Sequence, residues 1–190
     1  MLKKLKSNWW VILVGAGILA LAFYLRFYKL TSIPPSPYWE EVALGYDAYS
    51  ISQTLKDHHG NFLPLVSFES FGDWKPSGYF YILVPFVKLL GLKLLVVRLP
   101  SALAGMAIVV GVAVLIWILV KETKLFAHLR KKTQTRFVYL ASFVAMFIAA
   151  VSSWGIMFSR AAWEANLSTA FLLWGVITFY IFEARQKKSK

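Results

Sequence analysis

The run Leu99-PSALAGMAIVVGVAVLIWIL-Val120 carries no charge and is long enough to cross the hydrocarbon core of a bilayer as a helix. Phe137 to Ser159 and Ala165 to Phe182 are also free of charged residues, and Trp9 to about Tyr28 has none before Arg26. These four runs predict an all-α fold, a polytopic transmembrane helical bundle of about four spans. The spans are placed at about 9–28, 99–120, 137–158 and 165–182.

The composition agrees with a membrane protein and excludes several other classes. The chain is 58% hydrophobic with a mean hydropathy of +0.59, whereas a soluble domain of this size needs more charge on its surface. The net charge of +12 does not indicate nucleic-acid binding, because the basic residues cluster beside the apolar runs. The chain has no cysteine, which excludes disulfides, iron–sulfur clusters and thiolate zinc sites.

The positions of the basic residues predict the topology. Residues 79–97 are apolar but interrupted, and could form a short span or a surface helix. If they crossed the membrane, the basic stretch 121–136 and the basic C-terminal tail would both lie outside, against the positive-inside rule. We therefore expect a plasma-membrane protein with both termini in the cytoplasm, a long outer segment at 29–98 and a short outer turn at 159–164. The first span is expected to be retained, since no small-residue cleavage site follows it.

The long outer segment is expected to contain two surface helices separated by a loop. Residues 39–56 contain no proline and read as a helix lying along the membrane surface. Residues 56–78 contain two glycines before Gly78 and two prolines, and are interpreted as loop. Asp47 and Asp57 are interpreted as solvated charges, and the adjacent His58 and His59 as a solvated loop pair rather than a metal site.

This topology places several charged residues on the outer face, close to the membrane boundary. Charges there are costly unless they are paired, solvated or used in function. Arg160 and Glu164 are four residues apart, so they could simply pair along a helix. The residues concerned are Glu40, Glu41, Asp47, Lys75, Arg98, Arg160 and Glu164.

The order of these residues resembles a known family. An acidic pair follows the first span, then come a Lys-Pro step, an Arg-Leu-Pro and a Ser-Arg with an acid four residues on. This order is similar to that of the N-terminal part of the GT-C-type integral membrane glycosyltransferases, in the group of protein O-mannosyltransferases and lipid A aminoarabinose transferases. The motifs read Trp39-Glu40-Glu41, Asp73-Trp74-Lys75-Pro76, Val97-Arg98-Leu99-Pro100 and Phe158-Ser159-Arg160 with Glu164.

The resemblance implies a reaction and a role for each of these residues. It implies transfer of a sugar from a polyprenyl-phosphate carrier to an acceptor hydroxyl on the outer face, with inversion at the anomeric carbon. Glu40 matches the acid that acts as general base, and Glu41 matches the second catalytic acid, which orients the loop or Glu40. Lys75 matches a lysine that contacts the carrier phosphate, and Arg98 and Arg160 are candidates for the same anion. Glu164 matches an acid of the second outer loop.

The expected partners are a polyprenyl-phosphate-linked sugar, a hydroxyl acceptor of unknown kind and the lipid bilayer, with no nucleic acid. No cofactor is expected, although the acids permit a divalent metal. Because the family's module has more spans than four, residues 1–190 are interpreted as the N-terminal part of an enzyme completed by a C-terminal continuation or a partner subunit. The alternative is a non-catalytic membrane subunit that binds the lipid carrier. A transporter is disfavoured, since the last three spans have no charge at their centres.

Overall fold

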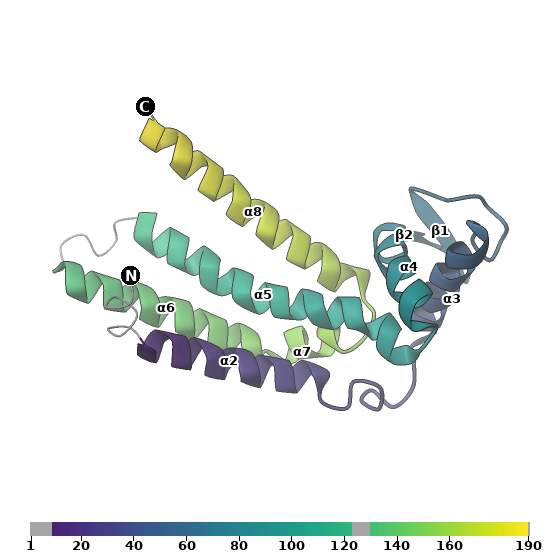
Figure 1. The fold of residues 1–190 in the computed structure, drawn as a ribbon, viewed down its shortest axis with the longest axis horizontal. Coiled ribbons are helices and arrows are strands. Elements are labelled where there is room, and N and C mark those ends of the chain that lie inside the picture. The colour runs from purple at the N-terminus through teal and green to yellow at the C-terminus, as the bar shows by residue number, and fades with distance from the viewer. Residues whose placement is uncertain (1–8, 123–129, 190) are drawn as a thin grey trace. The chain divides into compact units, whose positions relative to one another are not determined.

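The computed structural model describes residues 9–122 and 130–189 (Figure 1). The N-terminal residues 1–8 and residues 123–129 of the basic stretch 121–136 lie outside the described residues. The described elements are α2 (Trp9–Phe27), α3 (Trp39–Thr54), β1 (Ser67–Ser70), β2 (Asp73–Pro76), α4 (Gly78–Leu90), α5 (Leu94–Glu122), α6 (Lys131–Val151), α7 (Ser153–Ser159) and α8 (Glu164–Ser189).

Four helices are long and apolar enough to cross a membrane, and they confirm the predicted all-α membrane fold. They are Trp9–Phe27, Leu94–Lys121, Lys131–Val151 and Glu164–Gln186. The predicted spans near 9–28, 99–120 and 165–182 coincide with α2, α5 and α8. By contrast, α4 has only 13 residues, too few to cross a bilayer as a helix. The ambiguous segment 79–97 therefore divides between α4 and the first turn of α5.

The third predicted span, 137–158, is not one helix. α6 already begins at Lys131 and ends at Val151, and Ser152 leaves the helical conformation with ψ at 120°. The Ser152 hydroxyl then accepts the backbone N–H of Gly155 at 3.4 Å, in the manner of an N-cap of α7. A serine hydroxyl that satisfies the backbone locally offers an alternative to the continuous helix, and the apolar pattern alone does not show this.

The described residues group into two compact units. The first unit contains residues 1–25, 106–155 and 169–190, and the second contains 26–105 and 156–168. Helices α2, α5, α7 and α8 each contribute residues to both units.

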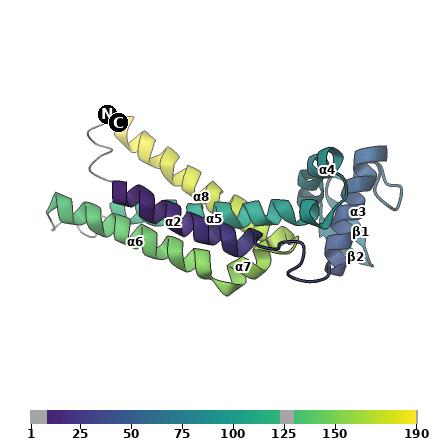
Figure 2. The ribbon, with the colours of Figure 1, turned by 60° about the horizontal axis from the view of Figure 1, so that its bottom comes forward.

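The core of the first unit is built from small and medium-sized apolar side chains. Ala22, Val109, Met146 and Ala150 form a buried cluster from α2, α5 and α6. Figures 1 and 2 both show α2 and α6 side by side, and the ring of Trp10 packs edge-on against Tyr139 and Phe143 of α6 at 6.0 and 6.2 Å.

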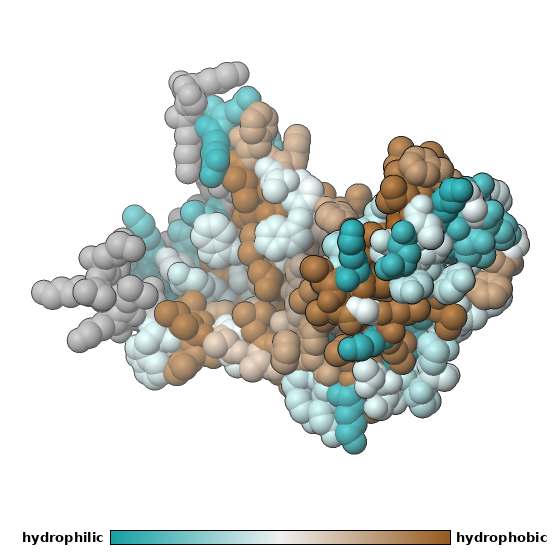
Figure 3. Space-filling model, turned by 45° about the vertical axis from the view of Figure 1, so that its right-hand side comes forward, coloured by the Kyte–Doolittle hydropathy of each residue, from teal (hydrophilic) through white to brown (hydrophobic). Residues whose placement is uncertain are grey.

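Within the same unit, α5 and α8 approach closely. The indole N–H of Trp174 donates to the carbonyl of Ala107 at 3.1 Å, and Gly111 faces the side chain of Leu173. Small residues that let two backbones come close are typical of helix packing in membranes. The outward side chains remain apolar, for example Leu172 and Phe179, which are 72% and 64% exposed. In Figure 3 such apolar side chains form much of the visible surface.

The second unit has its own apolar core between α3, α4 and the short sheet. Leu44, Ile51, Phe68, Phe80 and Leu83 are all almost fully buried, and the rings of Phe68 and Phe80 stack at 4.1 Å. The helix expected at 39–56 is confirmed as α3, and α4 is a second short helix of the same segment. That these helices lie along the membrane surface stays a prediction.

Residues 56–78, expected to be loop, contain a small β-hairpin. β1 pairs with β2 in antiparallel register, so that Ser70 lies opposite Asp73. The two residues between them, Phe71 and Gly72, have φ of 54° and 75°. Positive φ at both central positions is typical of the two-residue turns that match the twist of a hairpin. A phenylalanine is rare in this conformation, and the sequence therefore gave little indication of the turn.

Gly105 of α5 provides a test of packing in the second unit. A Cβ at this position would lie 2.7 Å from the Cβ of Ser159 and 3.1 Å from Nε of Arg26. We expect Gly105→Ala to lower the free energy of unfolding by about 1–3 kcal/mol, as overpacking does elsewhere. The matched control is Gly175→Ala, since nothing lies within 4 Å of a Cβ there. It should be neutral or stabilising, because alanine favours helix. Thermal unfolding in detergent compares the two variants. Equal stability of Gly105→Ala and Gly175→Ala would contradict this packing.

Candidate functional site

The charged residues singled out by the sequence all belong to the second unit. α3 carries Glu40 and Glu41 in its first turn, β2 carries Lys75, and α5 carries Arg98 one turn after its start. Arg160 and Glu164 flank the turn between α7 and α8. The structure separates these six residues into a buried group, centred on Glu41 and Arg98, and a partly exposed group, centred on Lys75.

The buried group is organised by an ion pair between Glu41 and Arg98, whose side chains are 1% and 0% exposed. Nε of Arg98 donates to Oε1 of Glu41 and Nη2 donates to Oε2, both at 2.9 Å. This parallel arrangement is the strongest geometry available to a guanidinium and a carboxylate. The two residues are 57 positions apart in the chain.

The remaining donors of Arg98 are all satisfied by backbone carbonyls. Nη1 donates to Leu30 at 2.7 Å and to Pro34 at 3.1 Å, and Nη2 donates to Ser36 at 3.1 Å. A guanidinium has five N–H groups, and all five are therefore used within the protein. Arg98 thus fastens the segment between α2 and α3 to the start of α5.

The carboxylate of Glu41 is equally well satisfied. Its Oε1 accepts the backbone N–H of Ala162 at 2.8 Å, and its Oε2 accepts that of Tyr38 at 2.9 Å. The bond to Tyr38 is half of a capping box at the start of α3, which explains why a helix begins there. The predicted role of Glu41 in orienting the loop has a structural counterpart in these contacts, whereas a catalytic role stays a prediction.

Arg160 also binds backbone carbonyls of the segment that follows α2. Nη2 donates to Tyr28 at 2.6 Å and to Ile33 at 2.9 Å, and Nε donates to Ile33 at 3.1 Å. Burial lowers the pKa of Arg160, and the nearby charge of Arg98 lowers it further. In this structure Arg98 and Arg160 therefore lie against protein carbonyls, and direct contact with a phosphate would require these bonds to break.

The partly exposed group contains a lysine held between two carboxylates. Nζ of Lys75 donates to Glu40 at 2.8 Å and to Asp73 at 2.7 Å, and the side chains of Lys75 and Glu40 are 21% and 17% exposed. The hydrogen bond to Asp73 and then that to Glu40 raise the pKa of Lys75 above its ordinary value of 10.5. Lys75 is thus kept as a cation at the edge of the protein, beside a carboxylate from another element.

Glu164 completes this group. It interacts electrostatically with both Glu40 and Lys75, and its Oε1 is buried with no hydrogen-bond partner among the described residues. Glu40 and Lys75 are therefore in direct contact, and Glu164 lies near enough to interact with both; a role of the three residues in a reaction stays a prediction. Among the described residues, no three His, Asp or Glu side chains are arranged to hold a metal ion.

Two aspartates interpreted as solvated charges are in fact buried. Asp47 is 0% exposed and pairs with His58, and Asp57 is 4% exposed. Burial opposes ionisation of Asp57, but hydrogen bonds from Asn61 and from the backbone of His59 outweigh it, so its pKa is lowered. An Asp followed by Gly and Asn is a turn signal that could have indicated the role of Asp57. The pairing of Asp47 with His58 has no comparable local signal, because it joins α3 to the loop beyond it.

Comparison with known proteins identifies no family for this chain. No family model, no curated protein and no solved structure matches the chain. Membership of the GT-C glycosyltransferases therefore stays a prediction from the order of the motifs.

The two adjacent glutamates should differ sharply in their effect on stability. Glu41→Gln leaves the charge of Arg98 buried without a counter-ion, which typically costs about 3–5 kcal/mol. Glu40→Gln removes a partly exposed ion pair, and the loss should be about 1 kcal/mol or less, since Lys75 keeps Asp73 as a partner. Equilibrium unfolding of both variants in mixed micelles measures the difference.

The double variant Glu41→Gln with Arg98→Gln serves as the control for this pair. It should lose less stability than the sum of the two single variants, because neither side chain is then left as an unpaired charge. Equal losses for Glu40→Gln and Glu41→Gln would contradict the assignment of the buried pair as the structural one.

Proposed function

We propose that the chain takes part in transferring a sugar from a polyprenyl-phosphate carrier to an acceptor hydroxyl on the outer face of the membrane. The observation that carries this proposal is the ion pair between Lys75 and Glu40. It joins a permanent cation to a carboxylate at a partly exposed position, in the segment that the charge distribution predicts to face outward. These are the two groups that displacement of a phosphate by a hydroxyl requires.

The proposed chemistry is a single displacement at the anomeric carbon. A bond forms from the acceptor oxygen to this carbon while the bond from the carbon to the carrier phosphate oxygen breaks. The proton of the hydroxyl passes to the carboxylate of Glu40 as general base. The electron pair of the broken bond stays on the carrier phosphate, whose increased negative charge Lys75 stabilises. Attack from the side opposite the leaving group inverts the configuration.

The ion pair also suggests how carrier binding activates the base. While Lys75 is bonded to Glu40, Oε1 of the carboxylate is occupied by the ammonium and is not available to an acceptor hydroxyl. A carrier phosphate that takes the place of Glu40 at Lys75 leaves the carboxylate available to the acceptor. Asp73 keeps Lys75 in position during this exchange, because its own hydrogen bond to Nζ is independent of Glu40.

The buried residues support this site by positioning it. Glu41 and Arg98 hold the first turn of α3, and therefore Glu40, against the start of α5. In this proposal Arg98 and Arg160 act on protein carbonyls, and Lys75 makes the phosphate contact. Glu164 lies near Glu40 and Lys75, and burial raises the pKa of its carboxyl. A C-terminal continuation or a partner subunit would supply the rest of the lipid and acceptor sites.

The four long apolar helices indicate that the chain is a membrane protein. We propose that it lies in the plasma membrane with both termini in the cytoplasm, so that Glu40 and Lys75 face outward. This orientation follows the positive-inside rule.

Transfer should depend on Glu40 and Lys75 separately. Loss of a general base typically costs a factor of about 10²–10⁴, which is the reduction expected for Glu40→Gln. Lys75→Ala should reduce transfer by about 10²–10³ and also weaken binding of the carrier phosphate. Membranes that contain the natural chain or one of the variants are incubated with radiolabelled polyprenyl-phosphate hexoses and, separately, with the corresponding pentoses. The radioactivity that passes from the carrier to acceptor material measures transfer.

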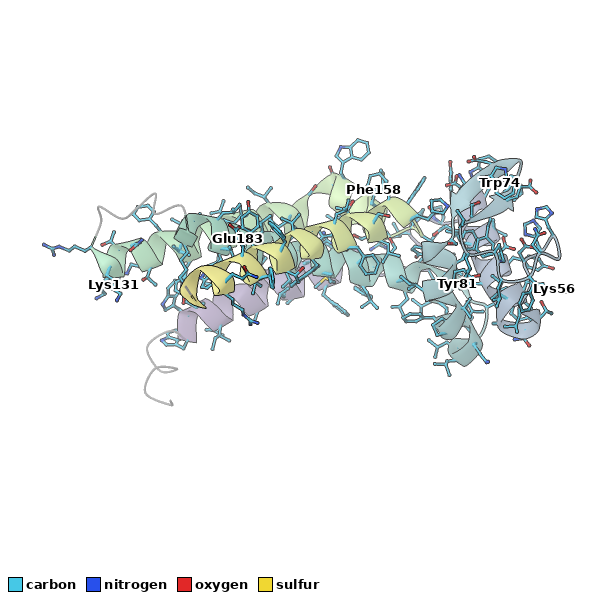
Figure 4. All side chains as sticks on the ribbon, turned by 90° about the horizontal axis from the view of Figure 1, so that it is seen from above. Lys56, Trp74, Tyr81, Lys131, Phe158 and Glu183 are labelled. Carbon is cyan, nitrogen blue, oxygen red and sulfur yellow. The ribbon has the colours of Figure 1, made fainter. Side chains whose placement is uncertain are left out.

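Matched controls come from the same outer segment. Glu69→Gln changes another carboxylate of the hairpin, and Lys56→Ala removes an exposed lysine; both should keep full transfer. Figure 4 shows Lys56 well separated from Trp74, the neighbour of Lys75. Full transfer by Glu40→Gln and Lys75→Ala would refute the proposal. Carrier binding that depends on Lys75, without transfer of any sugar tested, would instead favour the non-catalytic carrier-binding subunit.

The orientation can be tested with single cysteines, since the natural chain has none. Asn61→Cys is expected to react with a membrane-impermeant maleimide on intact cells. Thr135→Cys should react only after the cells are permeabilised. Both positions are exposed, so differences in burial do not confuse the result. The reverse pattern would refute the proposed orientation.

A further inference from the structure

A cavity of about 440 Å³ lies in the first unit, between the end of α5 and the start of α6. This volume falls in the range of about 300–1,000 Å³ that is typical of ligand pockets. α5 contributes Trp117 and Lys121, which are about one helical turn apart. α6 contributes residues at the spacings of one helical face, which are Lys131, Gln134, Thr135, Val138 and Tyr139. In Figure 4, Lys131 is labelled at the first turn of α6.

The cavity lies at one membrane boundary of both helices. Lys121 is the last residue of the candidate span Leu94–Lys121, and Lys131 is the first residue of the candidate span Lys131–Val151. Trp117 and Tyr139 lie about one and two turns inside these ends, and aromatic side chains gather at this depth near lipid headgroups. The phosphate groups of phospholipids lie at the same boundary, so a headgroup can enter the cavity without the lipid leaving the bilayer.

The two lysines of the cavity have no counter-ion among the described residues. The ion pairs that the described residues form all lie in the second unit. Nζ of Lys121 lies 4.5 Å from the ring centroid of Trp117, a cation–π contact that leaves its charge without a carboxylate. In the sequence, residues 121–136 contain six lysines and arginines and one acid, Glu122. Two cations that line one cavity repel each other, and an anion bound between them would be attracted by both.

The neutral groups of the lining narrow the class of anion. The Thr135 hydroxyl donates to the carbonyl of Lys131 at 2.9 Å, so its oxygen can still accept a hydrogen bond. The amide of Gln134 can both donate and accept. These groups suit the hydroxyls of a glycerol headgroup, whereas a choline or ethanolamine headgroup would bring a further cation beside the lysines. Trp117, which is 39% exposed, offers an apolar surface to the start of an acyl chain.

We propose that this cavity binds the headgroup of an anionic phospholipid, with its phosphate between Lys121 and Lys131 and its hydroxyls at Gln134 and Thr135. The positive-inside rule explains why the stretch 121–136 is basic, but not why two of its lysines line one cavity. In the orientation proposed above, the lipid belongs to the cytoplasmic leaflet. The lining residues all lie in the first unit, whereas Glu40 and Lys75 lie in the second, so this binding does not rest on the proposed transfer reaction.

Native mass spectrometry tests this proposal, with the chain in detergent titrated with phosphatidylglycerol or, as the zwitterionic probe, with phosphatidylcholine. One phosphatidylglycerol should bind, and at lower concentration than phosphatidylcholine. Lys121→Gln combined with Lys131→Gln should weaken its binding about 25-fold, or about fivefold for each lysine at a membrane surface. The matched control is Lys132→Gln combined with Arg136→Gln, which removes the same charge from the same stretch at two exposed positions outside the cavity lining. This control should bind phosphatidylglycerol like the natural chain.

The source of the phosphate is tested by competition with glycerol 3-phosphate, which carries the same headgroup without acyl chains. It should not displace phosphatidylglycerol at equal concentration, and displacement would assign the cavity to a soluble phosphate ester instead. Equal losses in the two double variants would refute the cavity, because overall charge alone would then attract the lipid. Equal binding of phosphatidylglycerol and phosphatidylcholine by the natural chain would also refute the proposal, and this comparison needs no variant. Lys75→Ala, which is expected to reduce transfer, should leave this lipid binding unchanged.

Discussion

The structure of the second unit depends on one buried interaction, the ion pair between Glu41 and Arg98. Removing two charges from water is expensive, and their mutual attraction compensates only when the remaining polar groups are also satisfied. Here the compensation is complete on both sides: Arg98 uses all five donors, and Glu41 accepts two backbone N–H groups besides the guanidinium. The pair therefore holds the chain after α2, the start of α3, the start of α5 and the turn before α8 in one arrangement.

The charged residues of this arrangement fall into two sets, which differ in whether their partners are backbone groups or side chains. Those with several backbone partners, Glu41, Arg98 and Arg160, fix the path of the chain. Lys75 and Glu40 are bonded through side chains at a partly exposed position, where a partner can be exchanged without unfolding the segment. In the proposed function, this satisfied interior would hold Glu40 in position beside Lys75.

Much of the fold could be predicted from single segments of the sequence. Apolar runs located α2, α5 and α8, and a stretch without proline located α3, because span length and helix formation depend on neighbouring residues. The break at Ser152 and the hairpin turn at Phe71 depend on a local hydroxyl and on an unfavourable φ, which apolar pattern does not report. The order of the charged residues singled out Glu41, Arg98 and Arg160 but not their partners, and the burial of Asp47 and Asp57 was not predicted. Arg98 bonds to Glu41, 57 residues away in the chain, and Asp47 bonds to His58. Both pairs are formed by tertiary packing, which no local pattern predicts.

Because bonded residues of the second unit are far apart in the sequence, the order of synthesis limits when each of these bonds can form. Glu41 bonds to the backbone of Ala162, 121 residues later, and Arg160 bonds to the carbonyl of Tyr28, 132 residues earlier. During synthesis α3 and its neighbours emerge long before these partners exist. Glu41 can meet Arg98 once the start of α5 has emerged, but its bond to Ala162 and the bonds of Arg160 form only after the turn between α7 and α8 has been made. The second unit therefore completes its hydrogen bonds only after residues 160–162 have been synthesised.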